Sequence, residues 1–341
     1  VPWQQYLFSG DTEPLRENYE GMKRYFAWLE TRAAGGPLAD GLGDWYDQIP
    51  GKPTRAYLTP PALTATAHYY QDAVVLARSA DVLGQPEEAA DCRRRAEEIR
   101  SGFNRAFFRP DSAEIYGSGS HTSLALPLAM GLVEESQRGR VFSALVSDIE
   151  RRGYATAGAV GYGYLLRALT EGGAAEWVYR LATDPEFPGY AYQLKLGNTA
   201  LAGSWSAQRG ASQNHFFLGQ IMEWFYADLA GLAPDPESTG FKRMIVKPHP
   251  IPELTWVEAS HRSLFGRHAV RWERDGGVFR LEVTVPPNTT AQVYLPANDV
   301  GQVNEGSDSA VRRPGVRYLR SEEGRAIFEI GSGVYRFEVK E

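Results

Sequence analysis

The stretch Leu232-Ala-Pro-Asp-Pro-Glu-Ser-Thr-Gly240 divides this sequence into two parts with different hydrophobic periods. Upstream of it, apolar residues recur at three- and four-residue spacing, which predicts amphipathic helices. Downstream of it, apolar and polar residues alternate between Gly, Pro, Asn and Asp turns, which predicts short strands. The sequence therefore predicts a helical domain over 1–233 and an antiparallel β-sandwich over 241–341.

The helical part is expected to contain about eight helices. In the first, Pro14 stands in the opening turn, and apolar residues recur at helical spacing from Leu15 to Leu29. The other helices are predicted over 60–83, 86–107, 120–132, 134–152, 160–170, 174–182 and 211–232.

These helices differ in how much of their circumference is apolar. Residues 58–83 and 216–232 are apolar on most sides, whereas 87–100 carries a strongly charged face. The contrast predicts an inner and an outer helical layer. The loops 35–53 and 185–210 are long enough to suggest that a functional site lies there.

The second part predicts eight strands. Each shows period-two alternation between turn residues. They are expected over 243–246, 254–260, 266–274, 277–285, 290–295, 316–319, 324–330 and 333–339.

Composition excludes several classes of function. The formal net charge is -6 with both signs interspersed, which gives no electrostatic reason to expect nucleic acid or an anionic membrane as partner. Cys92 is the only cysteine, so neither an intrachain disulfide nor a multi-thiolate metal site is expected. No metal-ligand motif stands out, and we expect neither a metal nor another cofactor. The compartment stays open.

The start of the chain, Val1-Pro-Trp-Gln-Gln, has no initiator Met and no signal-peptide pattern. We expect the chain to be processed, or to be a piece of something longer.

The loop Gly41-Leu-Gly-Asp-Trp-Tyr-Asp47 places two carboxylates beside two large rings. Asp side chains can hydrogen-bond sugar hydroxyls while Trp or Tyr stacks on the apolar face of the ring. The alternative is that Asp44 caps a turn and Trp45 fills the core. Both interpretations stay open on these residues alone.

Two segments at and beyond the second long loop form another candidate. They read Gly197-Asn-Thr-Ala-Leu-Ala-Gly-Ser-Trp205 and Ser212-Gln-Asn-His-Phe-Phe217. The imidazole of His215 could donate to a sugar hydroxyl or transfer a proton, or it could cap a helix.

The glycine spacing in Thr156-Ala-Gly-Ala-Val-Gly-Tyr-Gly163 superficially suggests a phosphate cradle. It neither follows a strand nor opens a βαβ unit, as a dinucleotide site would require. Close helix packing is the better interpretation.

Together these motifs, in this order, resemble the bacterial α-L-rhamnosidases of glycoside hydrolase family 78. The resemblance implies an (α/α)6 helical barrel, incomplete in this chain, followed by the β-sandwich. It also implies carbohydrate degradation, with a rhamnose-containing glycoside as substrate. By the same resemblance, the sugar site is expected to be lined by Asp44, Trp45, Tyr190, Trp205 and His215.

The resemblance also points to a missing group. The family's run is similar to Gly-Ala-Thr-Thr-Leu-Trp-Glu-Ser-Trp, and its Glu is the general base, whereas this chain has Gly203 in that slot. The family's general acid lies in a segment that nothing in this chain matches, so an upstream fragment completing the barrel is a possible partner. Inverting hydrolysis needs both groups.

Three explanations of Gly203 remain open. The chain belongs to an inverting α-L-rhamnosidase with its base replaced, or to a relative that binds rhamnosyl sugars without turnover. The third is a rhamnosyl-uronate lyase on the same fold. Elimination would need a different base, for which the candidates are Tyr190, Tyr192, Lys195 and His215.

Overall fold

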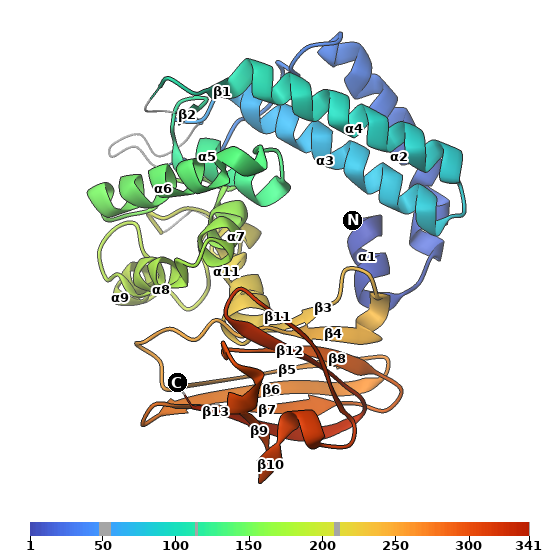
Figure 1. The fold of residues 1–341 in the computed structure, drawn as a ribbon. Helices are drawn as coiled ribbons and strands as arrows, with labels where there is room; N and C mark the ends of the chain where they lie inside the picture. Colours follow the sequence, from blue (N-terminus) through green and yellow to red (C-terminus); the bar gives the residue numbers. More distant parts are fainter. Residues whose placement is uncertain (48–55, 113–114, 208–211, 341) are drawn as a thin grey trace. The chain divides into compact units, whose positions relative to one another are not determined.

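The computed structural model describes residues 1–47, 56–112, 115–207 and 212–340 (Figure 1). Its contacts group the chain into two compact units, Arg16–Ile221 and Val1–Leu15 together with Met222–Glu341. The first unit is mainly helical and the second contains the two large sheets, so the expected combination of a helical part and antiparallel sheets is confirmed.

Helical hairpins build the first unit. Helix α3 packs on α4, α5 on α6 and α7 on α8, while α3 also contacts α5, and α5 contacts α7. The odd-numbered helices therefore form an inner row and their partners an outer one; Figure 1 shows α3 and α4 lying side by side. The bounds are α2 (Glu13–Ala33), α3 (Pro61–Val82), α4 (Pro86–Phe107), α5 (His121–Met130), α6 (Glu135–Arg152), α7 (Tyr162–Glu171) and α8 (Ala175–Thr183).

Burial follows this layering. Nearly every side chain of α5 is buried, and the Ser120 hydroxyl caps its first turn by accepting from the Ser123 N–H. Helix α4 instead buries one stripe, of which Ala89, Cys92 and Ala96 are members, and turns its charged face outward.

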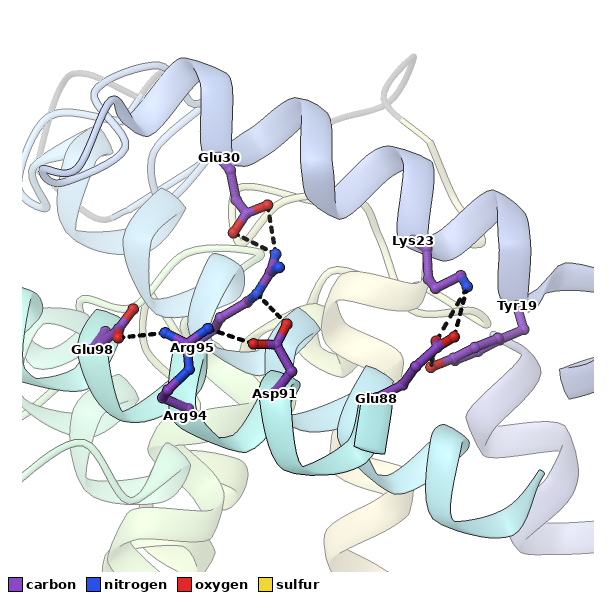
Figure 2. Close-up of polar contacts among 8 residues, drawn as sticks. All are labelled: Tyr19, Lys23, Glu30, Glu88, Asp91, Arg94, Arg95 and Glu98. Carbon is purple, nitrogen blue, oxygen red and sulfur yellow. Dashed lines mark hydrogen bonds and ion pairs between the residues drawn. The ribbon is translucent and has the colours of Figure 1, made fainter. Parts of the chain in front are cut away.

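An ion-pair network joins α2 to α4 (Figure 2). Glu88 on α4 accepts a hydrogen bond from the Tyr19 hydroxyl at 3.0 Å and pairs with the Lys23 ammonium at 3.1 Å. One helical turn or more further along, Arg95 bridges Glu30 of α2 and Asp91 of its own helix, each at 2.7 Å. These contacts fix the rotation of α2 above the apolar stripe of α4.

Several helical predictions need correction. The single helix expected over 211–232 is wrong: of the described residues there, 212–215 are not helical. Helices α10 (Phe216–Gly219) and α11 (Ile221–Glu223) and the π-helix η1 (Trp224–Leu229) follow. The periodicity of apolar residues does not distinguish these forms, and the extended backbone of His215 delays the start of α10. Helices α1 (Pro2–Ser9) and α9 (Tyr190–Lys195) and the short hairpin of β1 (Phe108–Arg109) and β2 (Ile115–Tyr116) were not predicted.

Two sheets build the second unit. One has the strand order β10-β9-β13-β7-β6-β5 and is antiparallel throughout; the other has the order β11-β12-β8-β4-β3 and contains one parallel pair, β4 with β8. The bounds are β3 (Leu232–Pro234), β4 (Arg243–Val246), β5 (Trp256–Ser263), β6 (Gly266–Asp275), β7 (Val278–Val285), β8 (Thr290–Leu295), β9 (Val303–Glu305), β10 (Asp308–Ser309), β11 (Val316–Glu322), β12 (Arg325–Ile330) and β13 (Gly333–Lys340).

Alternation places the core of this unit. On β7, Phe279, Leu281 and Val283 are buried while the residues between them are more exposed. The buried Trp272 on β6 donates its indole N–H to the Leu229 carbonyl at 2.8 Å. All eight predicted strands are present within a few residues, whereas β3, β9 and β10 were not predicted. Within the described ranges, no helix is both long and apolar enough to cross a membrane.

Candidate functional site

Asp44 lies at the centre of a buried set of hydrogen bonds. One of its oxygens accepts from the Thr122 hydroxyl and from the Gly158 N–H, the latter at 2.7 Å. The other accepts from the N–H groups of Val160 at 3.0 Å and Gly161 at 2.8 Å. Burial raises the pKa of Asp44 to about 6, and these donors act against that rise. Because the residue is fully buried, its carboxylate holds the loop 158–161 and faces no solvent.

The glycines of this loop are needed for close approach. A Cβ at Gly158 would lie 2.4 Å from the Trp45 carbonyl oxygen, and one at Gly161 would lie 2.0 Å from the Thr122 hydroxyl oxygen. Neither contact is possible for a real side chain. The glycine spacing therefore reflects close packing, as predicted.

Trp45 is more exposed than the neighbouring Asp44. Its backbone carbonyl accepts from the Ala159 N–H at 2.6 Å, while its indole is 39% exposed. The neighbouring Asp47 is buried and accepts backbone hydrogen bonds from Tyr57, Leu58 and Thr59. Asp44 and Asp47 thus hold this loop in place through buried hydrogen bonds, and Trp45 remains available to a ligand.

A buried histidine that the sequence analysis missed holds the same loop from the other end. His121 Nδ1 accepts from the Thr156 N–H at 3.0 Å, and its Nε2 lies 3.1 Å from the Asp148 carboxylate. Burial lowers the pKa of His121. The ring is therefore neutral, with its proton on Nε2. That nitrogen lies beside the Asp148 carboxylate without the alignment of a hydrogen bond. These partners lie far apart in the sequence, so no local pattern could have identified them.

Tyr190 and Trp205 belong to a buried aromatic cluster. Their rings lie 5.1 Å apart, and Tyr162 of α7 lies 5.3 Å from Trp205. The Tyr190 hydroxyl donates to the Leu218 carbonyl at 2.7 Å, and burial raises its pKa well above the ordinary value. The indole N–H of Trp205 has no hydrogen-bond partner among the described residues. Both rings are almost completely buried, so they support the segments around them.

Gly203 lies directly beside His215. A Cβ added at Gly203 would lie 3.2 Å from Ser212 Cβ and 3.3 Å from His215 Cγ. Two backbone bonds hold the segments together, from the Gly203 N–H to the Ser212 carbonyl at 2.8 Å and from the His215 N–H to the Leu201 carbonyl at 3.1 Å. A side chain at position 203 would therefore emerge against the imidazole.

The imidazole of His215 has a defined orientation. Its Nδ1 accepts from the Phe217 N–H at 3.1 Å, so it caps α10, and its ring stacks on Phe216 at 4.6 Å. With Nδ1 accepting, the neutral ring carries its proton on Nε2. His215 can therefore donate to a ligand through Nε2 while it caps the helix.

The other two candidates for an elimination base are engaged elsewhere. Lys195 forms an ion pair with Glu186 at 2.8 Å, which raises the pKa of its ammonium. Tyr192 packs edge-on against Phe187 with ring centroids 5.8 Å apart. A lysine held in its protonated form is poorly suited to act as a base.

The structure thus brings the candidates together in two groups. Asp44 and Trp45 lie with the loop 156–161, whereas Tyr190, Gly203, Trp205 and His215 gather around the segments 197–205 and 212–217. Tyr162 and Gly161, neighbours in sequence, link the groups, since Tyr162 contacts Trp205 and the Gly161 N–H binds Asp44. Among the described residues, no three His, Cys, Asp or Glu side chains gather as a metal site would require.

Known proteins are similar to this chain in sequence and fold. Residues 1–229 match the bacterial alpha-L-rhamnosidase 6 hairpin glycosidase domain, and residues 231–310 match the bacterial alpha-L-rhamnosidase C-terminal domain. An alpha-L-rhamnosidase of Streptomyces avermitilis is 32% identical over 99% of this chain and 32% of its own length. One of Formosa agariphila is 27% identical over 100% of the chain and 38% of its own length. The chain thus spans about a third of the length of these curated relatives.

Solved structures agree with these matches. The Streptomyces avermitilis alpha-L-rhamnosidase complexed with L-rhamnose superposes with a TM-score of 0.88 at 31% identity, over 100% of this chain and 32% of that one. The alpha-L-rhamnosidase from Dictyoglumus thermophilum superposes with a TM-score of 0.90 at 28% identity, over 100% of this chain and 38% of that one. Since the first family model covers most of the sequence, this chain belongs to the bacterial alpha-L-rhamnosidase 6 hairpin glycosidase domain family.

Proposed function

We propose that this chain is part of an α-L-rhamnosidase-like glycoside hydrolase that removes terminal rhamnosyl residues with inversion. Gly203 takes the slot of the general base, and the general acid comes from residues outside this chain. The observation that carries the proposal is the position of Gly203 beside His215, where a longer side chain would lie against the imidazole. A base placed there would hold the attacking water beside a ring that donates to the sugar.

The proposed sugar site has two kinds of residue. Trp45 offers a partly exposed indole to the ligand, and His215 offers an Nε2–H that donates to none of the described residues. Asp44, Tyr190 and Trp205 hold the surrounding segments in place through buried contacts. The complex of the Streptomyces relative with L-rhamnose supports the choice of sugar.

The proposed domain division is 1–233 for the catalytic-type helical domain and 241–341 for the β-sandwich. It is supported by the two family models, which meet between residues 229 and 231. The compact units divide the chain at other positions, because Val1–Leu15 and the segment from Met222 onward group with the sheets.

Elimination and binding without turnover are the competing functions. Elimination is less well supported, because Lys195 is held protonated by Glu186 and the Tyr190 hydroxyl donates to a carbonyl. In His215 the unprotonated nitrogen is already occupied as a helix cap. Binding without turnover is decided by the experiment below.

The test restores the missing carboxylate. Gly203→Glu is compared with the isosteric Gly203→Gln and with the unaltered chain on 2,4-dinitrophenyl α-L-rhamnopyranoside. This leaving group departs as a stable anion, so the substrate reduces the need for a general acid. We expect Gly203→Glu to exceed Gly203→Gln by ~10²–10⁴ in kcat/KM, the usual contribution of a general base. The readout is dinitrophenolate release, with the anomer of the product assigned by NMR.

Added formate provides an independent arm. If Gly203 stands in the slot of the general base, free formate should act in place of the lost carboxylate and accelerate hydrolysis by the unaltered chain, whereas Gly203→Gln should block that gain. If Gly203→Glu stays inert even in the chain extended upstream to include the general acid, while L-rhamnose still binds by calorimetry, the hydrolase proposal is wrong. The chain is then a rhamnosyl-sugar-binding protein. Release of an unsaturated uronate from a rhamnosyl-uronate would instead favour elimination.

A further inference from the structure

A cavity of about 420 Å³ lies beside the loop that carries Trp45. Its walls come from the second half of α2, the loop 38–43 and the first half of α3, and Val160 completes it. Gly43 lines it and directly precedes Asp44, and Val160 donates its N–H to Asp44. The cavity therefore shares its frame with the candidate site, although none of the predicted sugar-site residues lines it.

Two aromatic rings form one wall. Tyr25 and Trp28 lie three residues apart on α2, their ring centroids are 5.9 Å apart, and their planes are inclined by only 25°. They are 55% and 54% exposed. Rings of this size are normally buried, so a nearly parallel pair exposed in a concave wall needs an explanation.

Polar groups lie on the facing wall. Asp72 of α3 is partly buried, and burial raises its pKa to about 6. Its carboxylate accepts no hydrogen bond from any residue that the structure describes. His68, one turn earlier, uses Nδ1 to donate to the Thr64 carbonyl at 2.8 Å, which leaves Nε2 as an acceptor. At the end of α2, Arg32 pairs with Asp40 at the rim.

We propose that this cavity binds one pyranose residue of an oligosaccharide, stacked on Tyr25 and Trp28 and hydrogen-bonded to Asp72 and His68. A pyranose has one apolar face and a rim of hydroxyl donors, and it matches an aromatic wall opposite two acceptors. A purely apolar occupant, such as the stripe of another helix, would leave the Asp72 carboxylate buried without a hydrogen bond, which is costly. A pyranose can stack on the two rings and donate hydrogen bonds to Asp72 and His68.

This binding site is separate from the proposed hydrolysis. It requires no base at position 203 and no residue of the Trp205 cluster. The choice of a rhamnosyl probe does rest on the proposed function. The experiment therefore reads the two sites independently.

The test uses the full chain labelled with 5-fluorotryptophan, and its eight tryptophan signals are assigned by single Trp→Phe substitutions. The probes are L-rhamnose and the disaccharide 6-O-α-L-rhamnopyranosyl-D-glucose. In ¹⁹F NMR, the Trp28 signal should shift and saturate with the disaccharide. Trp256, which is 55% exposed in the sheet unit, is the matched control and should not move.

Two variants test the recognition itself. Tyr25→Ala removes half of the stacking surface, and Asp72→Asn replaces an acceptor with a donor. Each should weaken disaccharide binding, read at Trp28, by roughly tenfold. Neither should alter the response of Trp45.

The outcomes separate the two proposals. A response at Trp45 with none at Trp28 overturns the cavity proposal and leaves the proposed function standing. A response at Trp28 alone keeps the cavity as a sugar site and speaks against the proposed site at Trp45. A Trp28 signal that ignores both sugars but moves with protein concentration shows that a second copy fills the cavity, which also overturns the proposal. If neither the Trp28 signal nor the Trp45 signal shifts with either sugar, the cavity proposal is also wrong.

Discussion

At the scale of single residues, the candidate site depends on groups with no access to ligand. Asp44 accepts four hydrogen bonds and His121 accepts a fifth, and all five donors but one lie in the segment 156–161. Gly158 and Gly161 make room for these contacts. The loop 156–161 therefore takes its shape from the Asp44 carboxylate, the neutral His121 imidazole and the two glycines, Gly158 and Gly161.

Replacing Gly161 by Ala should destabilise the chain. Its Cβ would overlap Thr122, and overpacking of this kind costs about 1–3 kcal/mol. The control is Gly139→Ala on α6, where nothing lies within 4 Å of the new Cβ and the better helix former should gain about 1 kcal/mol. Urea unfolding gives both values. Equal effects of the two substitutions would contradict the packing argument.

Asp44→Asn should act on stability rather than on sugar affinity alone. The amide NH2 of Asn cannot accept, so buried backbone N–H groups lose their partner at a cost of about 2–3 kcal/mol. Asp299→Asn is the control, since the exposed Asp299 caps a short turn through Gly301 at 2.9 Å and Asn caps equally well. Chemical denaturation of the two variants measures the change in the free energy of unfolding for each. A stable Asp44→Asn variant that merely binds sugar less tightly would restore the sugar-contact role predicted from the sequence.

At the scale of elements, helical hairpins position the loops of the site. The inner helices α3, α5 and α7 contact one another in order, and the loops that precede α3 and α7 carry Asp44 and Gly161. The outer helix α4 presents charge, and Figure 2 draws the network that joins it to α2.

Glu88→Ala should loosen α2 from α4. The substitution removes the Tyr19 and Lys23 contacts together, and because the pair is partly exposed we expect a loss of about 0.5–1.5 kcal/mol. Glu98→Ala is the control, because among the described residues Glu98 pairs only with Arg94 of the same helix. This substitution should cost about 0.3–0.5 kcal/mol. Urea unfolding at low salt and at 1 M NaCl measures both. A Glu88 effect that salt leaves untouched would mean that the Tyr19 hydrogen bond, rather than the ion pair, carries it.

At the scale of the whole molecule, buried histidines connect stability to pH. His268 on β6 is fully buried, its Nε2 lies 2.8 Å from the Ser263 hydroxyl, and burial lowers its pKa to about 4. An unfolded chain protonates this ring near its ordinary pKa of ~6.5. The stabilising contribution of the neutral ring is therefore complete above ~pH 6.5 and is lost as the pH falls toward 4.

His268→Gln should remove that dependence. Between pH 6 and 4.5 the unaltered chain should lose about 1.4 kcal/mol per pH unit more than the variant, the value for one proton taken up on unfolding. Urea unfolding of both proteins across this range gives the difference, and the contributions of the other titrating groups cancel. Parallel stability curves for the two proteins would show that His268 takes no part.

The elements that the sequence predicted well are those whose signal is local. Helices α3, α4 and α6 and strands β4 and β8 follow from periodicity and end within one residue of expectation. Short elements carry too few residues for a period, and α1, α9, β9 and β10 were therefore missed. The single helix predicted over 211–232 is wrong because the backbone of His215 is extended, although the residues after it are apolar enough for one long helix.

The sequence by itself determined the family and the change from helix to strand near residue 232, and it is the source of the proposal that Gly203 takes the slot of the general base. These properties reside in the order of residue types along the chain. Only the tertiary structure decided that Asp44 and Tyr190 face inward, that His121 holds the loop of the site, and that Gly203 lies against His215. The physical reason is that burial and hydrogen bonding depend on partners tens of residues away, as between Asp44 and Gly161. No local pattern records such partners.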